Sequence, residues 1–114
     1  MKRPERVRVL GKRVTISYVQ TGDEVLKGDG GDAGTGINDP DAQAIWVKDG
    51  LPFETEQDVV LHETIHILEA YMDIDLSEQA VSKLATGLLS VIKDNPGYWR
   101  YLATKERDRG PKAI

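Results

Sequence analysis

The chain has 114 residues, a formal net charge of −4 and no cysteine, with 39% hydrophobic and 30% charged residues. This length and balance predict one globular domain spanning residues 1–114, and they exclude a disordered chain. The lack of cysteine excludes disulfides and thiolate metal ligands, and no apolar run approaches the roughly 18 residues of a membrane span. Because no apolar stretch follows the basic start, we expect no secretory signal and a cytoplasmic location.

Strand patterns come first along the chain. Apolar and polar residues alternate over residues 6–19 with a break at Gly11, which predicts a β-hairpin with one face exposed to solvent. Residues 27–36 contain five glycines and match neither a calcium-binding nor a phosphate-binding loop. We interpret them as a surface loop, with a flap beside the active site as the alternative. The apolar run at residues 44–48 predicts a further strand or hairpin.

Two long helices are predicted after the strands. Thr55, with Asp58 three residues later, is expected to cap a helix that spans residues 56–72. Ser77 is expected to cap a second helix, which Pro96 stops. The apolar stripe of the second helix consists of Val81, Leu84, Ala85, Leu88, Leu89 and Ile92.

The predicted elements combine into an α+β fold. An antiparallel sheet of three to four strands is expected within residues 6–48, a two-helix unit at 55–95 and a tail at 96–114. The aromatic segment at 98–102 predicts a short helix packed on the body. The tail and residues 1–13 are basic while the middle is acidic, and we interpret the two ends as solvated. We do not expect nucleic acid binding, because no basic stripe is interleaved with aromatic residues.

The motif His62-Glu63-x-x-His66 contains both histidines of the chain. On a helix, residues four apart lie on one face about one turn apart, so the two imidazoles can bind a single ion. Glu63 projects about 100° round the helix and can reach a water on that ion without being a ligand. The alternative interpretation is a pair of hydrogen-bonded histidines in the core, with Glu63 as a partly buried paired carboxylate.

A third ligand is needed, because a catalytic zinc site usually has three protein ligands and one open position. Helix geometry places Glu78 at the inward edge of the second helix, so it is the favoured candidate. Asp73 and Asp75 are the alternatives. Glu69 lies on the histidine face, but three ligands in a row along one helix converge poorly on a tetrahedral ion. We therefore interpret Glu69 and Asp73 either as residues that hold a metal ligand in place through a hydrogen bond or as surface charges.

This pattern predicts metal-assisted hydrolysis. Zinc suits nitrogen and oxygen ligands with an open position, and Glu63 is expected to be the general base that activates water. Candidate donors to an oxyanion are Tyr98, Arg100 and Tyr101, although such residues mostly pack or lie at the surface.

The motif, followed by Leu76-Ser77-Glu78-Gln79 on the next helix, resembles the gluzincin metallopeptidases. With segments 9–12 and 93–96, it is similar to small phage-encoded proteins regarded as metallopeptidases. The resemblance implies a small zincin-like fold, zinc bound by His62, His66 and Glu78, and a viral peptidase. Its specific part covers residues 62–78. The peptidase resemblance also implies a peptide or protein substrate, which we expect to bind as an added strand against an edge strand at residues 44–48.

The sequence departs from thermolysin-type enzymes near Glu78. It lacks the asparagine that precedes this glutamate in those enzymes and the serine-aspartate pair that follows it. It also has no sizeable second subdomain that would form the opposite side of a substrate cleft. The alternative function is a zinc-binding interaction module with little or no catalysis, for instance a mobile-element protein that acts on a host partner. The sequence does not predict an oligomeric state.

Overall fold

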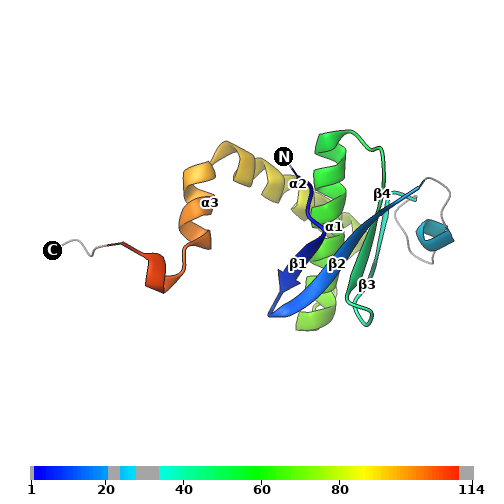
Figure 1. Cartoon of the computed structure of the whole chain (residues 1–114), viewed down its shortest axis with the longest axis horizontal. Coiled ribbons are helices and arrows are strands. Elements are labelled where there is room, and N and C mark those ends of the chain that lie inside the picture. Colours follow the sequence, from blue (N-terminus) through cyan, green and yellow to red (C-terminus); the bar gives the residue numbers. More distant parts are fainter. Residues whose placement is uncertain (1, 21–23, 28–33, 111–114) are drawn as a thin grey trace.

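The computed structural model describes residues 2–20, 24–27 and 34–110. Within these ranges a four-stranded sheet precedes three helices (Figure 1), which confirms the expected α+β class and element order. The elements are β1 (Arg6–Val9), β2 (Lys12–Val19), β3 (Gly36–Asp39), β4 (Ala44–Lys48), α1 (Phe53–Met72), α2 (Glu78–Asp94) and α3 (Pro96–Ala103), with short 3-10 helices η1 (Glu24–Lys27) and η2 (Glu106–Asp108). Of the predicted glycine-rich loop 27–36, residues 28–33 lie outside the described part.

The sheet has the strand order β1-β2-β4-β3. Strands β1 and β2 form the expected hairpin, whose turn places Leu10 and Gly11 at positive φ. Strands β3 and β4 form a second antiparallel hairpin, but β2 and β4 run parallel. The prediction of a wholly antiparallel sheet was therefore wrong at this central pair. The alternation of apolar and polar residues predicts that the two strands of each hairpin pair with each other. It does not show which strand of the second hairpin pairs with the first hairpin.

Strand β3, not residues 44–48, forms the sheet edge beside the helices. The predicted edge strand is β4, which lies between β2 and β3 in the sheet. Its inward side chains, Ile45 and Val47, are fully buried. The edge assignment was wrong because the strand at residues 36–39 is short and has a weak apolar pattern.

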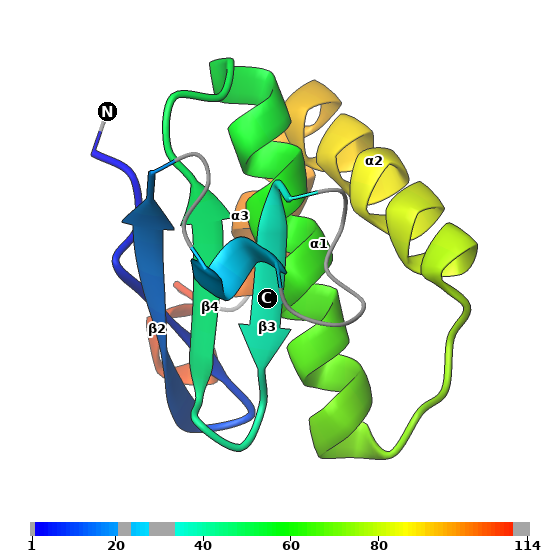
Figure 2. The ribbon, with the colours of Figure 1, turned by 90° about the vertical axis from the view of Figure 1, so that its right-hand side faces the viewer.

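Helix α1 packs across one face of the sheet (Figure 2). The buried core between them consists of Val9, Val14, Ile16, Ile45, Val47 and Ile67. The helix begins at Phe53 after Pro52, earlier than predicted, and no side chain caps it. Thr55 therefore lies inside the helix, because proline holds the φ that a helix start needs and the amide of Glu56 bonds to the Pro52 carbonyl at 2.8 Å.

Helix α2 begins as predicted, with the Ser77 hydroxyl accepting the amide of Ala80 at 3.1 Å, and it ends at Asp94. Only its first half packs on α1, through Val81 and Ala85. Helix α3 turns away at Pro96 and has no buried residue (Figure 1), so the expectation that it packs on the body was wrong. Among the described residues, no helix is long and apolar enough to cross a membrane.

Candidate metal centre

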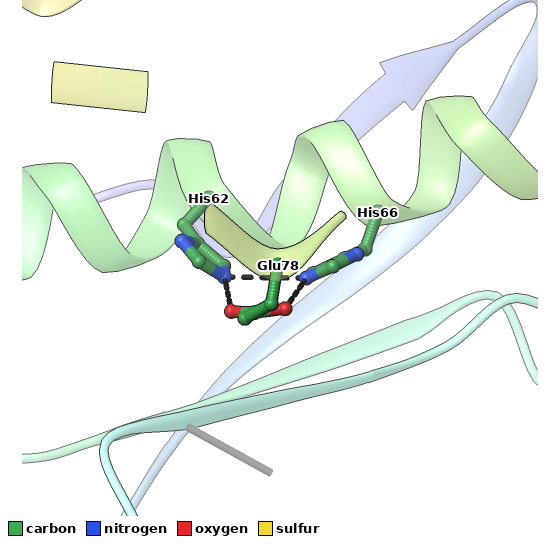
Figure 3. A group of neighbouring side chains, drawn as sticks. All are labelled: His62, His66 and Glu78. Carbon is green, nitrogen blue, oxygen red and sulfur yellow. Dashed lines mark hydrogen bonds and ion pairs between the residues drawn. The ribbon is translucent and has the colours of Figure 1, made fainter. Parts of the chain in front are cut away.

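Helix α1 presents both histidines on the face toward the start of α2 (Figure 3). The four-residue spacing places them one turn apart, and the Nε2 atoms of His62 and His66 lie 3.2 Å from each other. The two rings meet edge to face at 64°, with their centroids 4.9 Å apart. Both imidazoles thus direct the same nitrogen toward one point.

Glu78 completes this group from the first residue of α2. Asp73 ends α1 with a left-handed backbone (φ 55°), and a short connection returns the chain to Ser77. One carboxylate oxygen of Glu78 lies 2.6 Å from Nε2 of His62, and the other lies 2.9 Å from Nε2 of His66. The structure thus unites the three residues that the sequence singled out, whereas Asp73 and its alternative Asp75 do not belong to the group.

Glu69 determines which nitrogen of His66 carries a proton. Its carboxylate lies 2.8 Å from Nδ1 of His66, and because an ionised carboxylate only accepts hydrogen bonds, Nδ1 is the donor. A neutral His66 therefore presents the lone pair of Nε2 to Glu78 and to Nε2 of His62. Lone pairs that converge in this way repel one another unless a cation or a shared proton lies among them.

The spacing of the two imidazoles suits a metal ion. Nitrogens bound to one tetrahedral ion at roughly 2.0–2.1 Å lie roughly 3.3 Å apart. The 3.2 Å between the two Nε2 atoms is close to that spacing, and one ligand atom from each of the three residues lies within 4.8 Å of the others. The Glu78 oxygens, at 2.6 and 2.9 Å from the two nitrogens, lie at hydrogen-bond distances, so the carboxylate would move outward to admit an ion. His62 is buried, whereas the Glu78 side chain is 49% exposed, so solvent can reach the group beside Glu78. His62, His66 and Glu78 thus form a group that could hold a metal ion.

The carboxylate of Glu63 lies between α1 and strand β3. The side-chain amide of Asn38 donates to Oε1 of Glu63 at 2.9 Å. The other oxygen, Oε2, is buried without a hydrogen-bond partner in the described structure, and the residue is 2% exposed. A buried polar atom without a partner costs about 1–3 kcal/mol, so a further donor to Oε2 would stabilise this carboxylate.

Asn38 and Gly36 were not identified as site residues from the sequence. Both lie on the inward face of β3, two residues apart, as the alternation of a strand requires. A Cβ on Gly36 would lie 2.7 Å from Cγ1 of Val59 and 3.1 Å from Cγ of Glu63, so only glycine lets β3 approach α1 this closely. The glycine content of the preceding segment was a signal for such an approach, but nothing in the sequence indicated its target.

Replacing Gly36 with alanine is expected to destabilise the protein by about 1–3 kcal/mol, because the methyl group would overlap Val59. Urea unfolding measures this change. Gly87→Ala is the matched control, since a Cβ on Gly87 meets nothing within 4 Å in the middle of α2. Gly87→Ala should stabilise by roughly 0.5–1 kcal/mol. Equal stability of Gly36→Ala and the wild type would contradict the close contact between β3 and α1.

Replacing Glu69 with alanine is expected to weaken metal binding about 10–100-fold. Glu69 bonds to His66 and also accepts the amide of Leu76 at 2.8 Å, so it fixes both the imidazole and the connection that carries Glu78. Competition with a chromophoric chelator measures the affinity. Asp75→Ala removes a carboxylate from the same connection outside the group and should leave the affinity unchanged. Equal losses of metal affinity in both variants would show that Glu69 contributes only its negative charge to metal binding.

The candidate oxyanion donors do not reach this group. Tyr98, Arg100 and Tyr101 belong to α3, beyond the far end of α2, whereas Glu78 lies at its start. A helix of 17 residues is about 25 Å long, so these side chains are too distant to contact a substrate at the histidines. The structure agrees instead with the favoured interpretation of these three as surface residues, since all of them are exposed.

The chain matches no protein-family model, no curated protein and no solved structure. The function proposed below rests on the geometry of the three converging side chains.

Proposed function

We propose that this protein is a small zinc-dependent peptidase of the gluzincin type. The observation that carries the proposal is the convergence of two imidazole nitrogens and a carboxylate from His62, His66 and Glu78. Zinc is the favoured ion because the chain offers nitrogen and oxygen ligands without thiolates and leaves one position open. Bound zinc would lower the pKa of water and polarise a carbonyl group.

The residues around the ion support a division of roles. Glu63 would accept a proton from the attacking water and transfer it to the leaving amine. Asn38 holds one oxygen of this carboxylate and leaves Oε2 for the proton. Glu69 holds the imidazole of His66 through Nδ1, so that the lone pair of Nε2 would be available to a bound ion. The base and two of the three ligands thus come from α1, a rigid element held by the sheet.

The edge strand β3 is the surface on which an extended peptide would bind. One side of β3 pairs with β4, and within the described sheet no strand pairs with the other side. Because Asn38 on this strand contacts Glu63, a peptide added as a further strand would pass beside the base. This placement replaces the expectation that residues 44–48 bind the substrate.

Peptide hydrolysis can be tested by incubating the purified, zinc-loaded chain with a mixture of unrelated unfolded proteins. New peptide termini, identified by mass spectrometry, are expected to appear with zinc, to disappear with a chelator and to return when zinc is added back. Cleavage that continues unchanged in the chelator would contradict the proposal, as would an absence of new termini at any zinc concentration.

The burial of Glu63 favours a second candidate, a zinc-binding interaction module. A carboxylate that is 2% exposed and bonded to Asn38 can serve to join β3 to α1 without entering any reaction. In that case the metal would stabilise a surface for a protein partner, and hydrolysis would be absent. Substitution of Glu63 separates the two functions and is described in the Discussion.

A further inference from the structure

The second half of α2 and the whole of α3 form an arm that exposes a large apolar surface. The arm, defined as residues 86–103, lies outside the proposed metal site. Its large apolar side chains that are at least 40% exposed are Leu88, Val91, Tyr98, Trp99, Tyr101 and Leu102. So many large apolar side chains exposed on two consecutive helices are typical of an interaction site.

The shape of the molecule shows that the arm is not folded back on the body. The chain measures 58 × 30 × 25 Å and has a radius of gyration of 15.7 Å, whereas a compact domain of this length has about 13 Å. Figure 1 shows α3 standing apart from the sheet. An isolated helix of eight residues is marginal in water, so α3 needs a packing partner that the described chain does not provide.

A hollow of about 490 Å³ lies between the arm and the body. Its apolar lining includes Phe53, Val60 and Leu61 of α1 with Leu89, Ile92 and Trp99 of the arm. Phe53 at its rim is itself 56% exposed. The molecule therefore carries both an unpacked apolar helix and an apolar recess of a size that side chains of such a helix can fill.

We propose that the arm binds a second copy of this chain, with α3 of each copy inserted into the hollow of the other. Because each copy supplies one arm and one hollow, an exchange about a two-fold axis satisfies both and closes at two subunits. A foreign partner would need to supply both an apolar helix for the hollow and a recess for α3. A second copy of this chain supplies both, because it carries the same arm and the same hollow.

The exposed area is of the size that a stable dimer requires. Phe53, Tyr98, Trp99 and Tyr101 are 44–75% exposed. Since an aromatic side chain buries roughly 150–250 Å², their exposed parts amount to on the order of 450 Å². The exposed aliphatic side chains raise this area toward the roughly 800 Å² that each partner buries in a standard interface.

Sedimentation equilibrium of the purified chain tests this inference. The monomer has a mass of 12.7 kDa, and we expect the wild type to sediment at twice that mass at micromolar concentrations. Tyr101→Ser combined with Leu102→Ser should weaken dimerisation roughly a hundredfold or more. Both side chains are exposed within one subunit, so the subunit should keep its fold, which far-UV circular dichroism checks.

Met72→Ser is the matched control, because it removes an exposed apolar side chain at the far end of α1 and should leave the dimer intact. A wild type that stays monomeric up to about 100 μM would overturn the inference, whatever other protein it binds. A double variant that dimerises as well as the wild type would also overturn it. Neither result depends on zinc or on peptide hydrolysis, so the proposed function is tested separately.

Discussion

The His66→Ala variant is expected to lose stoichiometric zinc while the wild type retains one ion per chain. His66 contributes one of three converging ligand atoms, and its Nε2 lies 2.9 Å from Glu78 and 3.2 Å from Nε2 of His62. Loss of a residue that merely supports a ligand costs about 10–100-fold in affinity, so the loss of a ligand should cost more. Elemental analysis after dialysis, together with chelator competition, measures the change.

Thermal unfolding gives an independent measurement of the same site. An ion at 100 times its dissociation constant stabilises the folded state by about 2.7 kcal/mol, so zinc should raise the unfolding temperature of the wild type but not that of His66→Ala. Thr64→Ala is the control on the same helix, since the Thr64 hydroxyl bonds only to the Val60 carbonyl within the helix. Full zinc retention in His66→Ala, or a wild type that binds none, would contradict the site.

The Glu63→Gln variant is expected to lose about 10²–10⁴-fold in kcat and to bind zinc as the wild type does. Glutamine has nearly the same shape, and its side-chain oxygen can still accept the hydrogen bond from Asn38, but it cannot accept a proton from water at neutral pH. The rate of peptide cleavage and the zinc content are measured on the same preparation. The matched control is Glu106→Gln on η2, far from the histidines along the chain.

The outcome separates the two candidate functions. Loss of cleavage with full zinc content identifies Glu63 as the base and supports a peptidase. A variant that cleaves at the wild-type rate would exclude the base role of Glu63. If the wild type binds zinc but cleaves nothing, and Glu63→Gln mainly lowers stability, the carboxylate is a structural link between β3 and α1. The interaction module would then be the better description.

The metal-binding group could be predicted from the sequence because its geometry is local. His62 and His66 are one helical turn apart, so any helix through the motif brings them together. Glu78 follows after one short connection, and its position relative to the apolar stripe of α2 predicted its direction. The same reasoning separated it from Asp73 and Asp75, which lie in the connection itself.

The surroundings of the group could not be predicted, because they depend on contacts between distant segments. Asn38 lies 25 positions before Glu63, and the two meet only because β3 forms the edge of the sheet. Two separate strand patterns do not show that β2 and β4 run parallel. The apolar pattern of α3 predicted burial, but a periodic pattern does not indicate whether the partner lies in the same chain.

Glu69 connects the metal group to the corner between the two long helices. One of its oxygens bonds to His66 and the other to the amide of Leu76, just before the helix that carries Glu78. An ion in the group would favour the closed corner over any opened form by mass action. If the proposed site is occupied in the cell, zinc supply would therefore affect how readily cellular proteases degrade the chain. Zinc starvation would shorten its lifetime before its fold as a whole failed.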